Sequence, residues 1–297
     1  MRPEALALMA AGCWAFSSLF SAPPAQRLGA FAFSRWRMLF ASVLLWALAW
    51  HSGTWGSLAG SAWLWLGVSG LIGIFLGDTA LFACMNRLGP RRSGVLFATH
   101  AGFSAWLAWW WLGEVLWGWA LVGAVLLVAG VMLAIVWGKR SDEAHGWEQT
   151  RGGLMGGVAL GLLAALCQSV ATLMLKPLMS TGVDPVAASA VRMSMALAAH
   201  GVLWLLWSGA RAQAAVRAQD LWLTFASAAV AMALGMTLIL AAMREGQAGV
   251  VAILSSVTPI LILPLLWLVY RRRPAWGAWM GAVLAVWGTA LVIGPVA

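Results

Sequence analysis

Apolar runs long enough to cross a bilayer recur along almost the whole chain, separated only by short segments with glycine, proline or charged residues. About 20 helical residues span the roughly 30 Å hydrocarbon core, and helices satisfy the backbone groups that lipid cannot. The runs are too long and too little alternating for barrel strands. We therefore predict an all-α membrane protein with ten transmembrane helices, at residues 4–22, 31–50, 62–85, 92–112, 116–137, 153–175, 185–207, 219–243, 248–270 and 275–294.

The composition leaves no room for a large aqueous domain, because 63% of the residues are hydrophobic and only 9% are charged. The net charge of +9 suggests nucleic acid at first, but the basic residues cluster beside the apolar runs, as membrane orientation requires. We expect no nucleic-acid partner. The three cysteines lie inside apolar runs and are expected to be small packed residues rather than disulfides.

The second half of the chain repeats the first. A shift of 158 residues aligns Gly77 with Gly235, Thr79 with Thr237, and the Gly-Ala-Val-Leu stretch at 123–126 with that at 281–284. Smaller shifts align the earlier spans, and one of them matches Arg35 with Arg192. We predict a five-helix repeat over residues 1–140, a central loop over 141–151 and a second repeat over 152–297.

An odd number of spans in each repeat would turn the second repeat upside down in the membrane. The loop charges agree: twelve basic residues fall on one side, and only Arg2, Lys176 and Arg244 fall on the other. The positive-inside rule then predicts two inverted repeats in the cell inner membrane with both termini in the periplasm. The first apolar run resembles a signal peptide, but its counterpart in the second half cannot be one.

These features together resemble the EamA branch of the drug/metabolite transporter superfamily, and within it the YddG-type amino-acid exporters. The resemblance rests on the two inverted halves, on Arg35 and Arg192, on Leu112-Gly-Glu114, and on the repeated Gly-Ala-Val-Leu stretches. It covers essentially the whole chain. It implies a metabolite transporter, but it does not choose between amino acids, nucleosides and drugs. The Leu-Gly-Glu motif does not recur after the ninth span.

Asp78 is the carboxylate that lies well inside a predicted span, where a charge needs a polar cavity or a partner. It would bind a substrate ammonium or carry a coupling proton, and the alternative is a structural hydrogen-bond anchor. His100, in the fourth span, would bind ligand or exchange a proton with Asp78. Its alternative is a packed histidine satisfied by a neighbour. Thr258 occupies the matching position in the second half.

Polar side chains recur at helical spacing in the first span of each half. Trp14 and Ser18 lie in one half, and Gln168 and Thr172 lie at corresponding places in the other. This pattern favours the lining of a cavity at the interface between the repeats. Hydrogen bonding between helices is the alternative.

The ninth span carries a similar cluster that includes Ser255, Ser256 and Thr258, followed by Pro259. A proline there would free a carbonyl and bend the helix toward the cavity. We therefore add Ser255 and Thr258 to the predicted substrate-binding set, which consists of Trp14, Ser18, Asp78, His100, Gln168, Thr172, Ser255 and Thr258.

Other marked residues are expected to be structural. Arg35 and Arg192 lie near helix starts, which favours snorkelling or bonds to backbone carbonyls over contact with a substrate carboxylate. Glu114 is placed to cap the next helix. Small residues repeated at four-residue spacing on the sixth span, such as Gly157 and Gly161, would let helices approach closely.

Transport is the function that this pattern favours, because inverted repeats form two half-structures that rock around a central site. The spans contain no His-Glu-x-x-His motif and no nucleophilic triad, which argues against an intramembrane enzyme. A channel would normally show rings of like residues. We expect a monomeric exporter in contact with lipid, without metal or cofactor, with a cavity lined by spans one, three, four, six, eight and nine. The resemblance to YddG-type exporters implies that it carries neutral and aromatic amino acids. Nucleosides and cationic compounds are the alternative substrates.

Overall fold

The computed structural model describes residues 1–58, 60–137, 153–270 and 276–293, which form helices and connecting loops without a β-strand. The first half contains α1 (Pro3–Leu28), α2 (Ala30–His51), η1 (Thr54–Ser57), α3 (Ala62–Ser69), η2 (Gly70–Asp78), α4 (Thr79–Ala98), α5 (His100–Leu112) and α6 (Gly118–Trp137). The second half contains α7 (Leu154–Leu173), α8 (Lys176–Ser180), α9 (Pro185–Leu206), η4 (Ser208–Ala210), α10 (Ala218–Ser227), η5 (Ala228–Gly235), α11 (Met236–Glu245), α12 (Ala248–Ser255), α13 (Thr258–Tyr270) and α14 (Trp276–Ile293).

The predicted all-helical membrane architecture is confirmed at the level of its long helices. Six of the described helices are long and apolar enough to cross a bilayer: Pro3–Leu28, Ala30–His51, Ala62–Gly89, Leu154–Ser180, Pro185–Leu206 and Ala218–Glu245. Three further apolar helices are shorter in the described part of the chain. The count of ten spans therefore stays a prediction.

The repeat in the sequence reappears in the local helix geometry. The third predicted span contains the π-helix η2 and the eighth contains the π-helix η5, and their first residues, Gly70 and Ala228, are 158 positions apart. The fourth and ninth spans are each broken near the middle. The second part begins at His100 in one and at Thr258 in the other, again 158 positions apart.

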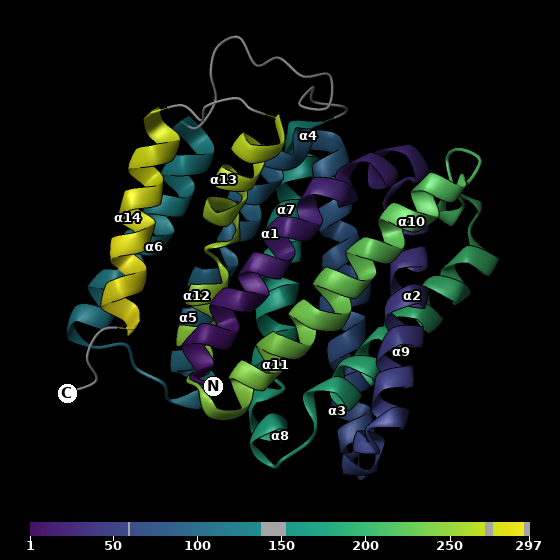
Figure 1. Ribbon diagram of the computed structural model, residues 1–297, viewed down its shortest axis with the longest axis horizontal. Helices are drawn as coiled ribbons and strands as arrows, with labels where there is room; N and C mark the ends of the chain where they lie inside the picture. Colours follow the sequence, from purple (N-terminus) through teal and green to yellow (C-terminus); the bar gives the residue numbers. More distant parts are fainter. Residues whose placement is uncertain (59, 138–152, 271–275, 294–297) are drawn as a thin grey trace.

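Corresponding helices of the two halves pack against each other in antiparallel pairs at opposite edges of the molecule (Figure 1). In the α6–α14 pair, a Cβ added at Gly123 would lie 2.7 Å from the carbonyl oxygen of Gly288, and one added at Gly130 would lie 2.6 Å from that of Gly281. The repeated Gly-Ala-Val-Leu stretches thus permit backbone contact between the two helices.

The α2–α9 pair is also antiparallel. Trp46 of α2 donates a hydrogen bond to Ser194 of α9 at 2.8 Å, whereas Phe31, near the start of α2, contacts Trp207, just after the end of α9. The start of α1 and the end of α14 lie toward the same end of the bundle (Figure 1).

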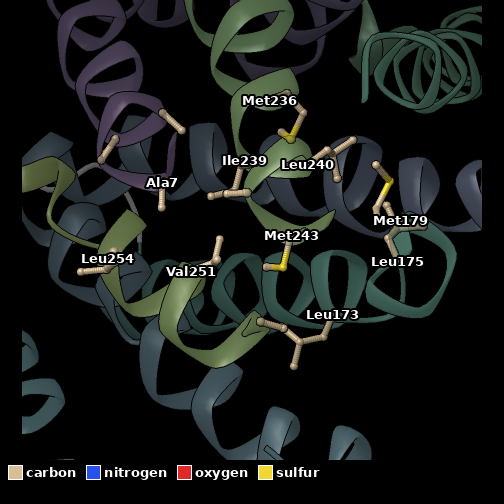
Figure 2. Packing of buried hydrophobic residues seen from close by; sticks show 14 of the residues in the cluster. Ala7, Leu173, Leu175, Met179, Met236, Ile239, Leu240, Met243, Val251 and Leu254 are labelled. Carbon is tan, nitrogen blue, oxygen red and sulfur yellow. The ribbon is translucent and has the colours of Figure 1, made fainter. Parts of the chain in front are cut away.

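The interior between these edges is built from small and aliphatic side chains. Figure 2 shows buried residues of α1, α7, α11 and α12 directed toward one region, among them Ile239, Met243 and Val251.

The glycines of α7 allow α4 to pack closely, since a Cβ at Gly157 or Gly161 would lie within 2.6 Å of Leu88 or Leu96. This confirms the close approach predicted for the sixth span.

Candidate functional site

A small cavity lies where four helices from both halves meet. α5 of the first half and α7, α11 and α12 of the second half line it, and its free volume of about 10 Å³ is enough for about one water molecule. This is less than the roughly 300–1,000 Å³ of typical ligand pockets. The lining residues are His100, Ser104, Gln168, Thr172, Ile239, Met243, Ala252 and Ser255.

Gln168 and Thr172 form the polar wall that α7 contributes. The Gln168 side-chain amide donates a hydrogen bond to the Thr172 hydroxyl at 3.2 Å, and that hydroxyl donates to the Gln168 carbonyl at 2.7 Å. The four-residue spacing places both on one helix face. Each group has a partner within its own helix, so the polar wall is tolerated in the interior and still offers lone pairs to a guest.

α5 and α12 contribute the other polar groups. Ser104 donates to the hydroxyl of Ser169 at 3.0 Å, and Ser169 in turn lies 2.9 Å from the backbone carbonyl oxygen of His100, so these contacts hold α5 against α7. Across the cavity, Ser255 donates to the carbonyl of Ala252 at 2.8 Å. The buried His100 ring packs against Phe97, with ring centroids 5.1 Å apart.

The lining carries no formal charge except through protonation of His100. The polar groups face Ile239, Met243 and Ala252, so one part of the wall is apolar. A neutral or zwitterionic molecule suits such a wall, because hydroxyl and amide groups both donate and accept hydrogen bonds.

Half of the predicted binding residues meet at this cavity: His100, Gln168, Thr172 and Ser255. Ser104, Ile239, Met243 and Ala252 also line it, and they were not predicted. A sequence signal existed for Ser104, because it lies four residues after His100 on the same helix face. The lining comes from the predicted spans four, six, eight and nine, and spans one and three do not contribute to it.

The other predicted residues make contacts elsewhere. The Trp14 indole donates to the carbonyl of Ala231 in η5 at 3.1 Å, and Ser18 donates to the carbonyl of Ala15 at 2.6 Å. Thr258 donates to the carbonyl of Ser255 at 2.9 Å at the start of α13. In this structure, hydrogen bonding within and between helices, the alternative considered above, therefore describes Trp14 and Ser18.

Asp78 forms an ion pair away from the cavity lining. Its carboxylate accepts a hydrogen bond from Nη1 of Arg37 at 2.9 Å, and the Arg37 guanidinium lies over the rings of Phe33 and Phe82. Sequence reasoning missed Arg37. An arginine partner inside the membrane stabilises a buried carboxylate, so Asp78 needs no substrate to satisfy it here.

The alignment of Arg35 with Arg192 is wrong in register. Arg37 and Arg192 each lie seven residues after the first residue of their helices, and both are buried. A shift of 155 residues also matches Ser34, Met38 and Ala41 with buried residues of the same type, which are Ser189, Met193 and Ala196. The three-dimensional equivalent of Arg192 is therefore Arg37.

Arg35 and Arg192 consequently have different surroundings. Arg35 donates to the carbonyl of Ala210 at 2.9 Å and lies over the ring of Trp204, which confirms the predicted bond to backbone. Arg192 is fully buried, with 0% exposure, and its side-chain nitrogens have no hydrogen-bond partner among the described residues, so neither snorkelling nor a bond to a backbone carbonyl describes it. It is held against η2, where a Cβ at Gly70 would lie 2.4 Å from the Arg192 carbonyl oxygen.

Glu114 caps a helix, but a different one from that predicted. Its carboxylate accepts hydrogen bonds from the backbone N–H groups of Ala248 and Gly249 at 2.9 and 2.8 Å, so it caps α12 of the other half rather than the following helix, α6. Lys176 donates to the carbonyls of Met243 and Gly246 at 2.8 and 2.6 Å. These two residues fix both sides of the turn between α11 and α12, which lead to the cavity.

Comparison with known proteins identifies the repeat as a known unit. A model of the EamA-like transporter family matches residues 1–136 and again residues 155–294. A solved structure, described only as the crystal structure of a protein, is similar over 98% of this chain and 96% of that chain, with a TM-score of 0.78 and 16% sequence identity. At that identity the likeness shows the fold alone. The search of curated proteins gives no match.

Proposed function

Since the chain belongs to the EamA-like transporter family and is a membrane transporter of the drug/metabolite superfamily, we propose that it exports neutral amino acids, including aromatic ones, across the cell inner membrane. The substrate passes through the cavity between α5, α7, α11 and α12 by alternating access. Of the predicted binding residues, His100, Gln168, Thr172 and Ser255 contact it.

The observation that carries this proposal is the neutral, half-polar lining of the cavity. Among the eight lining residues there is no carboxylate for a cationic drug and no arginine or lysine for an anionic metabolite. A zwitterion instead uses hydroxyl, imidazole and amide groups for its two charges, and the apolar surface of Ile239 and Met243 for its side chain. The cavity has about 10 Å³ of free space in this conformation, so a substrate enters only when the surrounding helices move apart.

The proposed mechanism uses the antiparallel relation between the halves. The α6–α14 and α2–α9 pairs join equivalent helices that run in opposite directions, as inverted repeats require. In alternating access, each half takes up in turn the arrangement that the other had. Broken helices at α4–α5 and α12–α13 bring backbone groups near the cavity, where irregular structure is tolerated.

Coupling to protons would depend on a titratable group at the cavity. Of the two groups considered, Asp78 is engaged by Arg37, whereas His100 lines the cavity. A proton-coupled cycle therefore requires His100 as the group that binds and releases the proton. Facilitated diffusion requires no such group.

The proposal is tested with purified protein in liposomes and radiolabelled threonine, methionine and phenylalanine. Gln168→Ala should reduce flux at low substrate concentration by about threefold to tenfold, as expected for the loss of one or two hydrogen bonds to the substrate. Ser18→Ala is the matched control, because Ser18 bonds only within α1 in this structure and should transport at the wild-type rate.

Two outcomes would contradict this assignment. Equal flux in the wild type and in Gln168→Ala would show that the substrate does not pass through this cavity. Flux of nucleosides or cationic compounds alone would overturn the substrate class, while the transporter family would stand.

A further inference from the structure

Asp78 lies at a junction that both α2 and α9 contact. It is the last residue of the π-helix η2, and the next residue, Thr79, begins α4. Arg37 of α2 holds the carboxylate, and His200 of α9 lies 3.2 Å from the Thr79 hydroxyl. The junction is therefore clamped between equivalent helices of the two halves.

Arg192 is a second arginine near this carboxylate. Its side chain is fully buried and interacts electrostatically with Asp78. Within the described part of the chain, Nε, Nη1 and Nη2 of Arg192 have no hydrogen-bond partner. A buried guanidinium with unsatisfied donors is costly, so its retention at this position calls for a state in which it is paired.

Asp78, Arg37 and Arg192 follow the repeat only in part: the two arginines are equivalent in the two halves, but the carboxylate has no equivalent. Arg37 and Arg192 occupy equivalent places in the two halves, whereas the position 158 residues after Asp78 is Met236. One carboxylate thus has two arginines near it, one from each half, and in this structure only Arg37 is hydrogen-bonded to it.

We propose that Arg192 is the alternative partner of Asp78, and that the two end conformations of the transport cycle differ in which arginine holds this carboxylate. The inference rests on the proposed alternating access. In the present structure Arg37 holds Asp78, and in the opposite conformation Arg192 holds it. Both are positioning residues, because they act on the balance between the conformations and do not touch the substrate.

The contact between η2 and α9 is suited to the required movement. Gly70 of η2 faces the backbone of Arg192 in α9, whereas Gly73 faces Ala171 of α7, and a Cβ at Gly73 would also lie 3.4 Å from Nη2 of Arg192. Smooth glycine surfaces let one helix move along another, and the π-helical turn is a local irregularity that can be rearranged. The guanidinium of Arg192 therefore lies beside the element that carries Asp78.

The test measures conformation rather than flux. In a background without Cys13, Cys84 and Cys167, the reporter Ala252→Cys places a thiol in the cavity wall. An impermeant maleimide is added to right-side-out and to inverted vesicles, and the ratio of the two labelling rates is measured. Arg37→Gln and Arg192→Gln should change this ratio in opposite directions, each on the order of tenfold, because each variant leaves Asp78 only one partner.

Arg35→Gln is the matched control. It removes a neighbouring arginine that bonds to Ala210, and it should leave the ratio unchanged. Asp78→Asn weakens both pairs and should give a ratio between those of the two glutamine variants. If a glutamine variant does not reach the membrane, the corresponding lysine variant replaces it. A lysine ammonium pairs less well with Asp78 than a guanidinium does, so the ratio should shift in the same direction.

The exchange is overturned if the two variants shift the ratio in the same direction, or if neither shifts it. These results are distinguishable from failure of the proposed substrate. Opposite shifts without amino-acid flux support the exchange and reject the substrate, whereas flux that depends on Gln168 together with unchanged ratios rejects the exchange alone.

Discussion

At the scale of single residues, several charges inside this bundle are stabilised by partners from other helices. Asp78 is held by Arg37, and Arg27 at the end of α1 contacts Asp220 at the start of α10. Glu114 of the first half accepts hydrogen bonds from the first two backbone N–H groups of α12 in the second half. Such bonds decide how the two halves meet, because unsatisfied polar groups are expensive in lipid.

We expect Glu114→Ala to lower the free energy of unfolding by about 1–2 kcal/mol, because two backbone donors of α12 lose their acceptor. Glu245→Ala is the control, since this carboxylate is exposed on the adjacent helix end. The measurement is the thermal unfolding midpoint of both variants in the same detergent. A midpoint as high for Glu114→Ala as for Glu245→Ala would show that the cap has no net effect on stability.

At the scale of elements, irregular helices recur at equivalent places. Two π-helices and two broken spans occur at positions related by the 158-residue shift, although the local sequences differ: Gly70–Asp78 is rich in glycine, and Ala228–Gly235 is rich in alanine. A proline is not needed for the break, since α5 begins at His100 without one. The irregularity therefore belongs to the packing of the repeat rather than to one residue type.

The glycine contact between α6 and α14 leads to a prediction for these elements. Gly130→Ala should destabilise the protein by about 1–3 kcal/mol, because its Cβ would lie 2.6 Å from backbone atoms of Ala285 and Gly281. Gly102→Ala in α5 is the control, since nothing lies within 4 Å of its added Cβ and alanine favours the helix. Unfolding midpoints that fall equally in both variants would contradict the close contact.

At the scale of the whole molecule, the orientation in the membrane links the fold to the direction of transport. The loops after α2 and before α9 lie together, since the backbone N–H of Asp184 donates to Ser57 at 3.0 Å. The basic residues of the central loop, Lys139, Arg140 and Arg151, and Arg271 to Arg273 lie outside the described residues, so the charge argument for this orientation remains a sequence prediction.

We predict that both termini and these two loops face the periplasm. Ser52→Cys and Thr181→Cys should react with an impermeant maleimide in intact cells, whereas Ala215→Cys should react only in inverted vesicles. All three positions are exposed. Ser52 and Thr181 are chosen over their neighbours Gly53 and Gly182, whose φ angles of 69° and 96° disfavour a cysteine. Alkaline phosphatase fused to Ala297 is an independent test and should be active. Labelling of Ala215→Cys in intact cells would instead show that the opposite orientation holds.

The sequence by itself determined the helical membrane class, the two repeats and the family, because the length of apolar runs and self-similarity depend only on the order of residues. It also indicated four residues of the cavity: helical spacing indicated Gln168 and Thr172, and polar residues within apolar spans indicated His100 and Ser255. The tertiary structure decided the rest. The way α2 packs directs Arg37 toward Asp78 and Arg35 toward Ala210, and packing between the halves turns Trp14 toward η5. Such choices depend on which helix lies opposite, and the spacing of residues along one helix does not contain that information.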